Sequence, residues 1–269
     1  MEISFDCLFV CAMYQKGVAV KVSIITVCYN SADTILDTMN SVASQDYDEV
    51  EHIVVDGDST DGTLAILLSF SGKFCLISEK DQGIYDAINK GIGVASGDII
   101  GILNSDDMYH DNKILSRVVG EFLANDVDVV YGDLVYVSKT DIFKTVRYWK
   151  SSSFVKGSFF KGWHPAHPTM FVRKDAYLRY GLYDTSLKSA SDYELMLRFF
   201  EKNDVKSSYV SSIFVKMRCG GKSNKSIRNI IFSNLECYKS WKMNGFSISI
   251  GQFLSRPFSK LKQYYHAKK

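Results

Sequence analysis

The segment Ile99–Asp107, IIGILNSDD, decides the fold, because an apolar run ends there directly in polar, turn-forming residues. A continuous apolar run of this length is typical of a strand buried on both faces of a sheet. Four polar residues follow at the carboxyl end of that strand: Asn104, Ser105, Asp106 and Asp107. In open α/β sheets, ligands bind at the carboxyl ends of the strands. The segment therefore predicts a buried strand and a candidate site beside it.

Further β-rich runs flank this segment, at residues 22–28, 52–55, 74–77 and 127–131. Helix-like patterns lie between them, at residues 33–45, 62–70, 84–95 and 111–124. This alternation of strands and helices predicts a parallel α/β sheet. After residue 134 the pattern predicts short strands at 134–138, 142–148, 169–173 and 207–216, and helices at 173–180 and 191–203. No Pro- or Ser-rich linker precedes this part, so we expect it to continue the same domain.

Polar residues follow each of the first four predicted strands. They are Tyr29–Ser31, Asp56–Gly62, Glu79–Gly83 and Asn104–Asp107. Because the ends of parallel strands meet at one edge of a sheet, acidic groups gather there, which indicates a metal ion or hydroxyl groups as ligand. Asp56 ends a buried strand, where its carboxylate can accept a hydrogen bond from a nucleobase or a ribose. The adjacent Asp106 and Asp107 could equally form a turn and cap the next helix.

Five segments, in this order, resemble the family 2 glycosyltransferases, which have the nucleotide-diphospho-sugar transferase fold called GT-A. They are VSIITVCYN (22–30), VVDGDSTDGT (54–63), EKDQGIYDAINKGIGVASGDIIGILNSDD (79–107), HPAHPTMFVRKDAY (164–177) and GLYDTSLKSASDYELMLRF (181–199). The resemblance spans residues 21–218 and has the character of the bacterial enzymes that build surface polysaccharides. It implies an α/β fold with a Rossmann-like mixed sheet. Outside this span we expect an N-terminal extension of unknown role at residues 1–20 and a basic, amphipathic C-terminal helical extension at 219–269.

The resemblance also implies a binding site for a UDP-sugar along the strand ends. Its residues are Thr26, Tyr29 and Asn30 under the uracil, Asp56 and Asp58 at the base, and Asp81 and Gly83 near the ribose and diphosphate. Asn104, Ser105 and Asp106 match the family's D-x-D motif, whose last Asp binds Mn²⁺ or Mg²⁺. Here Asn104 replaces the first Asp, and its amide can bond a ribose hydroxyl but is a weak metal ligand. We therefore expect the metal on Asp106, with Asp107 as a second candidate ligand.

Asp192 matches the family's catalytic base, and Ser191 stands where the family more often has Glu. The implied reaction is an inverting, single displacement, in which Asp192 takes the proton of an acceptor hydroxyl and the metal neutralises the UDP leaving group. Without the resemblance, Asp192 would be interpreted as the cap of the following helix. Trp163 is expected near the acceptor, a saccharide or a lipid-linked oligosaccharide, and the resemblance places His167 near the acceptor or the diphosphate. Trp163 could stack on a sugar ring or pack in the core.

The net charge of +2 conceals two oppositely charged parts. Residues 216–269 hold 12 of the 32 Lys and Arg but one of the 30 Asp and Glu, so they carry +11 against −9 for residues 1–215. Apolar and aromatic residues recur at helical spacing within this basic segment. We expect it either to lie on an anionic membrane surface or to pack on the catalytic domain. Nothing in the charge indicates nucleic-acid binding, and no run is apolar enough to predict a membrane span.

The six cysteines fit no zinc framework, and reduced thiols indicate a cytoplasmic enzyme, peripheral at the inner face of the membrane if the basic segment binds lipid. Two other functions stay open. A sugar-phosphate nucleotidyltransferase should have a Gly-rich, Arg-containing loop after the first strand, but Cys28–Thr34 (CYNSADT) contains neither residue. A non-catalytic carbohydrate- or nucleotide-binding protein on a degenerate transferase fold should lack Asp106 or Asp192, yet both are present, and only Asn104 favours that interpretation.

Overall fold

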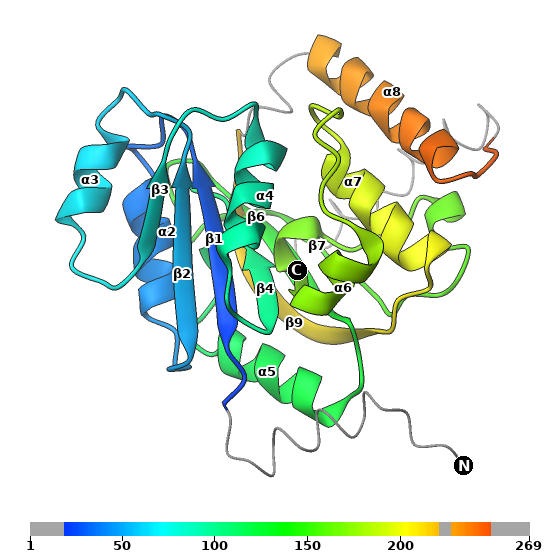
Figure 1. Ribbon diagram of the computed structural model, residues 1–269, viewed down its shortest axis with the longest axis horizontal. Helices are drawn as coiled ribbons and strands as arrows, with labels where there is room; N and C mark the ends of the chain where they lie inside the picture. Colours follow the sequence, from blue (N-terminus) through cyan, green and yellow to red (C-terminus); the bar gives the residue numbers. More distant parts are fainter. Residues whose placement is uncertain (1–18, 221–226, 249–269) are drawn as a thin grey trace.

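The strand β1 (Val22–Cys28) is buried at every position and lies at the centre of a parallel unit. In the computed structural model, which describes residues 19–220 and 227–248, it pairs with β2 (Val50–Asp56) on one side and β4 (Ile99–Ile102) on the other. The strand β3 (Cys75–Ser78) extends the sheet beyond β2. All four strands run in the same direction, so their carboxyl ends share one edge of the sheet (Figure 1).

The other half of the sheet is mixed. The short strand β8 (Phe171–Arg173) is antiparallel to both of its neighbours, β4 and β6 (Val129–Val137). In turn, β6 pairs in parallel with β9 (Ser207–Arg218) and antiparallel with β7 (Thr145–Trp149). The strand β5 (Met108–Tyr109), which follows the acidic turn, pairs with β9. The mixed α/β sheet confirms the predicted fold class, whereas the sequence pattern did not reveal the two-residue β5.

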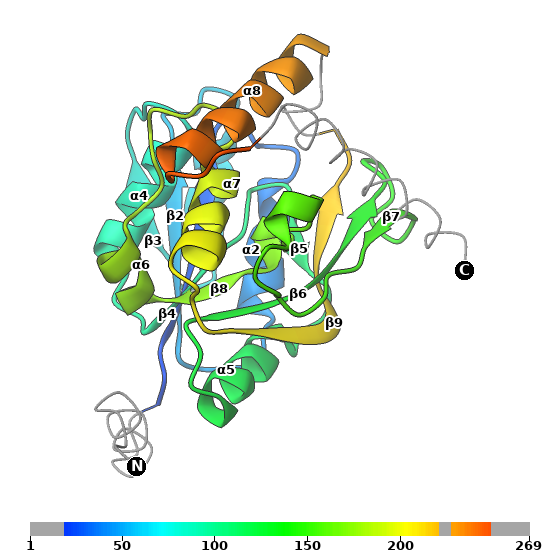
Figure 2. The same ribbon diagram turned by 90° about the vertical axis from the view of Figure 1, so that its right-hand side faces the viewer.

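Helices cover both faces of the sheet (Figures 1 and 2). One face carries α2 (Ile35–Ala43), α3 (Thr63–Ser69) and α5 (Ile114–Ala124). The other carries α4 (Ile84–Val94), α6 (Lys174–Tyr180) and α7 (Ser191–Met196), and α7 continues as a π-helical turn at Leu197–Lys202. Alternation along β1 explains the two layers, because Ile25 and Val27 pack with α4 whereas Ile24 packs with α5.

Two details of the predicted pattern are wrong. The expected strands at 127–131 and 134–138 form the single strand β6. Gly132 interrupts the apolar pattern of that strand, but a Cβ atom there would lie 2.6 Å from the ring of Phe214 on β9, so the close approach of the two strands requires glycine. The expected helix at 191–203 changes from α-helical to π-helical at Leu197.

The helix α8 (Ile227–Met243) is the described part of the predicted C-terminal helical extension, and it packs across α7 (Figure 2). Trp241 is fully buried, and its ring centroid lies 4.5 Å from that of Phe160. Asn244 donates a hydrogen bond of 3.0 Å to Glu194 of α7. This helix therefore shares the hydrophobic core of the α/β sheet and its covering helices. The rest of the extension and the predicted segment 1–20 lie outside the described residues, apart from positions 19–20, 219–220 and 244–248. Among the described helices, none has the length and apolar character needed to cross a membrane.

Candidate active site

The loops that follow β1 and β2 are joined into one rim by hydrogen bonds. Asn30 has a left-handed backbone with φ of 53°, which Asn tolerates better than most residues. It accepts a hydrogen bond of 2.9 Å from the Thr60 main-chain N–H and donates its own N–H to Ser59 Oγ at 2.9 Å. The Ser31 hydroxyl lies 2.8 Å from that of Ser105, after β4. The polar residues after three strands therefore meet, as the strand pattern predicted.

Asp56 is fully buried at the end of β2, and protein groups occupy its carboxylate. One oxygen accepts hydrogen bonds from the Ser59 hydroxyl and from the Cys28 thiol at 3.6 Å. The other accepts the Ser59 main-chain N–H at 3.2 Å and the Ser78 hydroxyl at 2.9 Å. A carboxylate has about four acceptor positions, and these bonds fill them. Asp56 therefore stabilises the loop. Asp58 and Asp61 are exposed, and Asp61 accepts hydrogen bonds from the Ala32 and Thr63 main-chain N–H groups.

Gly57 allows three predicted nucleotide-binding residues to come together. A Cβ atom on Gly57 would lie 2.3 Å from Asp81 Oδ2 and 3.5 Å from Tyr29 Cδ2. The Asp81 carboxylate also accepts the Gly83 main-chain N–H at 2.8 Å, just before α4 begins. Tyr29 is 48% exposed, so its ring is accessible beside Asp81. Tyr29, Asp81 and Gly83 thus occupy one continuous part of the rim.

Thr26 does not reach this rim, which corrects the prediction that it contacts the nucleotide. It lies inside β1, is fully buried, and has its hydroxyl 3.0 Å from His52 Nε2. Burial lowers the pKa of His52 to about 4, so the imidazole is neutral near pH 7 and can accept the hydrogen of the Thr26 hydroxyl. This pair belongs to the core of the sheet.

The acidic turn after β4 combines a partly exposed carboxylate with a buried one. Asp106 is partly exposed, whereas Asp107 is fully buried and accepts a hydrogen bond of 3.1 Å from the Asn104 amide. Burial and the neighbouring charge of Asp106 raise the pKa of Asp107. Asp107 Oδ1 is buried and has no hydrogen-bond partner among the described residues. Such an orphan oxygen beside a second carboxylate fits a divalent cation.

Within residues 19–220 and 227–248, no three His, Cys, Asp or Glu side chains gather closely enough to hold a metal ion by themselves. This agrees with the chemistry of Mg²⁺, which uses one or two carboxylates and completes its coordination with water and substrate phosphates.

Asp192 lies in the first turn of α7, partly exposed. The N-cap position of that helix is Ala190, and no side chain caps it, so Asp192 does not serve as the helix cap. Instead, Asp192 Oδ1 accepts a hydrogen bond of 3.1 Å from the hydroxyl of Tyr85, in the first turn of α4. The candidate base is therefore tied to the helix that begins directly after the Asp81–Gly83 loop.

The two predicted acceptor residues lie in different surroundings. Trp163 packs with aromatic side chains in the core, including Phe154, whose ring centroid is 5.7 Å away. These contacts agree with core packing, which was one of the two interpretations of Trp163. His167 Nε2 lies 2.7 Å from the Tyr183 hydroxyl, and burial lowers the pKa of His167. Tyr183 stacks on Tyr85 with centroids 5.9 Å apart, so His167 lies one layer behind the candidate base.

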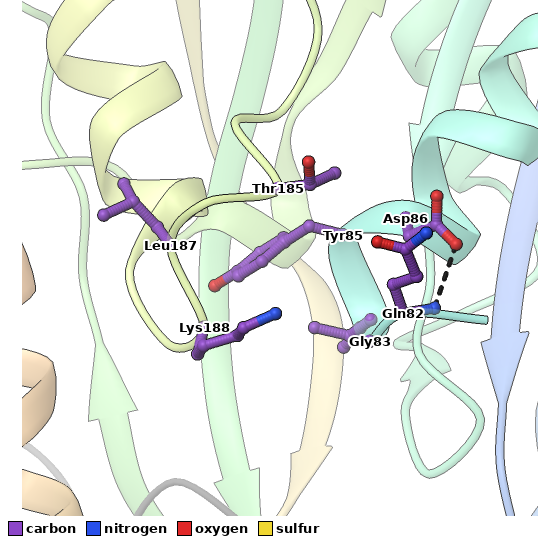
Figure 3. Close-up of a pocket in the computed structure, with 8 residues that line it drawn as sticks. Gln82, Gly83, Tyr85, Asp86, Thr185, Leu187 and Lys188 are labelled. Atoms are coloured by element: carbon purple, nitrogen blue, oxygen red, sulfur yellow. Dashed lines mark hydrogen bonds between the residues drawn. The ribbon is translucent and has the colours of Figure 1, made fainter.

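Two contributors to this region were missed from the sequence: Tyr85 and the loop before α7. The Tyr85 side chain lies between α4 and the loop that carries Thr185 and Lys188, where a small pocket opens (Figure 3). A tyrosine two positions after Gly83, in the segment GIYDA, was the available signal. The loop sequence itself gave no such signal, because the position of the loop depends on a hydrogen bond from Ser189 to Glu236 of α8, which lies 47 residues further along the chain.

The mixed α/β sheet with helices on both faces is the fold of the GT-A glycosyltransferases. The model of glycosyl transferase family 2 matches residues 23–181. A PGL/p-HBAD biosynthesis glycosyltransferase of Mycobacterium bovis is 30% identical over 210 residues, which cover 75% of this chain and 78% of that protein. An uncharacterized glycosyltransferase of Rickettsia prowazekii is 31% identical over 201 residues, 72% of this chain and 63% of that protein.

Solved structures share the fold at low sequence identity. Staphylococcus aureus TarS 1–349, in complex with UDP-GlcNAc, has a TM-score of 0.65 and 20% identity, covering 92% of this chain and 79% of that one. The mannosyltransferase PcManGT of Pyrobaculum calidifontis, in complex with GDP-Man and Mn²⁺, has a TM-score of 0.61 and 18% identity, covering 97% and 77%. The chain belongs to glycosyl transferase family 2. It spans less than two thirds of the length of the Rickettsia relative.

Proposed function

We propose that this enzyme transfers a sugar, with inversion, from a UDP-sugar to a hydroxyl group of a saccharide or lipid-linked acceptor during synthesis of a cell-surface polysaccharide. The observation that carries the proposal is the hydrogen bond between Tyr85 and Asp192. It ties a candidate base to the helix that starts at the proposed donor loop, Asp81–Gly83. Donor and base would then meet at the same edge of the sheet, as a direct displacement requires.

The proposed donor contacts follow the rim. The Tyr29 ring provides a surface for the uracil, and Asp58 and Asp81 provide carboxylates for base and ribose. Asp56 contributes by holding the loop that carries Asp58. Asn104 can donate the second N–H of its amide to a ribose hydroxyl while the first remains bonded to Asp107. TarS in complex with UDP-GlcNAc supports a uridine donor, although the GDP-Man complex of PcManGT shows that the fold also serves guanosine donors.

Asp106 and Asp107 would hold the divalent cation, Mn²⁺ or Mg²⁺. When bound, this cation supplies positive charge against the diphosphate leaving group. The orphan Oδ1 of Asp107 and the adjacent carboxylate of Asp106 support this assignment. Asp107 is held in place by its hydrogen bond from Asn104, and its main-chain carbonyl accepts the Thr38 hydroxyl at 2.8 Å.

Asp192 would act as general base on the acceptor hydroxyl. Its carboxylate takes the proton as the acceptor oxygen attacks the anomeric carbon from the side opposite the nucleotide, so one displacement inverts the configuration. His167 would contribute through Tyr183, with which it shares a hydrogen bond. Trp163 is not among the proposed acceptor contacts, because its side chain packs against aromatic residues of the core.

The exposed face of α8 is the proposed contact with an anionic membrane. Leu235 is 62% exposed and Ile231 is 56% exposed. The neighbouring Lys239 and Lys242 are exposed, whereas Glu236, the acidic residue of this helix, points inward. An apolar strip flanked by lysines suits anionic lipid headgroups, near which each basic residue contributes about 1 kcal/mol. This surface would bring a lipid-linked acceptor to the enzyme.

A nucleotide-release assay tests the proposal. The chain is incubated with Mn²⁺ or Mg²⁺ and with UDP-glucose, UDP-galactose, UDP-GlcNAc or GDP-mannose, and free nucleotide is measured. We expect release from one UDP-sugar, which chelation of the metal and Asp106→Ala each abolish. The variant Asp141→Ala, in an exposed turn after β6, provides a matched control. Release only from GDP-mannose, or full release after chelation, would contradict the donor or the metal assignment.

A further inference from the structure

We infer that Tyr85 is a positioning residue for the base, because its hydroxyl orients the Asp192 carboxylate and stabilises the ionised form. The inference rests on the proposed function, which makes Asp192 the base. The two residues are 107 positions apart in the sequence and come from the first turns of α4 and α7. The hydroxyl of Tyr85 lies 3.1 Å from Asp192 Oδ1.

The ring of Tyr85 is fixed in the orientation that this bond needs. Tyr85 is 8% exposed and stacks on Tyr183 at 5.9 Å, with an angle of 11° between the ring planes. The Tyr183 hydroxyl is in turn 2.7 Å from His167 Nε2, which fixes the second ring. An ordered pair of rings loses little entropy when its hydroxyl donates a hydrogen bond. The Asp192 carboxylate is therefore held by a rigid donor rather than by a mobile side chain.

The hydroxyl remains a donor across the working pH range. Burial and the negative charge of Asp192 raise the pKa of Tyr85. Burial also raises the pKa of Tyr183 and lowers that of His167, so both are neutral near pH 7. Glu194, on the same helix as Asp192, is paired with Arg198 at 2.8 Å.

A hydrogen bond donated to a carboxylate favours its charged form. Because the neighbours Tyr183 and His167 carry no net charge, the Tyr85 hydroxyl is the contact by which α4 favours ionised Asp192. It also fixes which carboxylate oxygen faces away from the acceptor, since Oδ1 is engaged by Tyr85.

A titration tests the hydrogen bond without any substrate. The carboxyl resonance of Asp192 is followed by NMR in the wild type and in Tyr85→Phe, with Asp192→Asn used to assign the signal. We expect its midpoint to move to higher pH in Tyr85→Phe. Tyr47→Phe is the matched control, because it removes a hydroxyl that donates to the Val20 carbonyl at the opposite edge of the sheet. An unchanged midpoint in Tyr85→Phe would overturn the inference.

Kinetics test the consequence for catalysis. We expect Tyr85→Phe to lower kcat for nucleotide release from the best UDP-sugar by about tenfold, the usual effect of one bond to a charged group, and to leave KM for that UDP-sugar unchanged. In an Asp192→Asn background the same substitution should have no effect. An equal loss in both backgrounds, or a loss seen in KM rather than in kcat, would contradict positioning of the base. Full activity of Asp192→Asn alone would instead contradict the proposed function, while the NMR titration would still report on the hydrogen bond.

Discussion

The carboxylate of Glu236, in α8, accepts a hydrogen bond of 2.7 Å from the main-chain N–H of Ser189, three residues before Asp192. Its second oxygen accepts the N–H of Lys188 at 2.8 Å. Glu236 is 7% exposed, so these bonds are shielded from water. A helix that lies beyond the part matched by the family thus fixes the loop that leads into the proposed base.

Glu236→Ala should therefore affect both stability and turnover. Leaving two buried N–H groups without an acceptor costs about 2–4 kcal/mol of unfolding free energy, which urea denaturation can measure. The freed loop should also lower kcat, while KM for the nucleotide sugar stays nearly unchanged. Glu49→Ala is the matched control, because Glu49 is exposed and should change the unfolding free energy by less than about 0.5 kcal/mol. An unchanged unfolding free energy in Glu236→Ala would show that Glu236 does not bind the main-chain N–H groups of Lys188 and Ser189 in solution.

The buried pair Thr26 and His52 predicts a pH-dependent stability. Burial lowers the pKa of His52 to about 4 from 6.5, so the folded protein resists its protonation and the unfolded chain does not. The stabilisation is complete above pH 6.5 and is lost as the pH falls toward 4, by up to about 3 kcal/mol. His52→Gln keeps a partner for Thr26 but cannot titrate, so its unfolding free energy should fall less between pH 7 and 5. If the unfolding free energies of the wild type and of His52→Gln fell equally between pH 7 and 5, His52 would not be the source of the pH dependence.

The sequence predicted the parallel half of the sheet well, because β1, β4 and the Ile53–Val55 run of β2 are buried on both faces and mostly apolar. It also identified the strand-end rim, because turn residues follow each strand. The exact roles of rim residues could not be predicted. Whether Asp56 faces a ligand or its own loop depends on Ser59 and Ser78, and the side-chain partners of a carboxylate have no sequence period.

Long-range contacts were also beyond the sequence pattern. The hydrogen bonds between Tyr85 and Asp192 and between Glu236 and Ser189 join elements whose positions are set by tertiary packing. The same limit applies to Thr26, which was assigned to the nucleotide by resemblance, although its position inside a buried strand directs it into the core.

Gly57→Ala should weaken binding of the donor nucleotide without lowering the stability of the fold. The new Cβ would lie 2.3 Å from Asp81 Oδ2, the end of a side chain that can rotate away at little cost to folding. Moving Asp81 should weaken UDP binding by about tenfold, the usual cost of a lost hydrogen bond to a carboxylate. Isothermal titration calorimetry measures the affinity, and thermal unfolding measures the stability.

The control for that experiment is Gly93→Ala, since a Cβ atom there would have no neighbour within 4 Å. Gly93 lies in α4, where Ala is about 0.5–1 kcal/mol more favourable than Gly, so this variant should be more stable and bind UDP normally. If Gly57→Ala bound UDP with wild-type affinity, Asp81 would not be part of the donor site.

Membrane contact by α8 should depend on its exposed apolar strip. Leu235→Glu places a negative charge in the middle of that strip and should abolish flotation with vesicles that contain phosphatidylglycerol. Salt should weaken binding of the wild type, because screening reduces the attraction between lysines and anionic lipid. Leu68→Glu is the matched control, because Leu68 is 70% exposed on α3. Equal flotation of Leu235→Glu and the wild type would exclude this helix as the contact.

The base assignment is tested most directly by Asp192→Asn, which preserves the size of the side chain and removes its ability to take a proton. Transfer rate and UDP-sugar affinity are measured on the same preparation, in the presence of the metal. We predict that transfer falls by about 10²–10⁴-fold, the usual contribution of a general base, while affinity changes by less than about twofold. Transfer at the wild-type rate by a folded Asp192→Asn protein would contradict the assignment and with it the proposed mechanism.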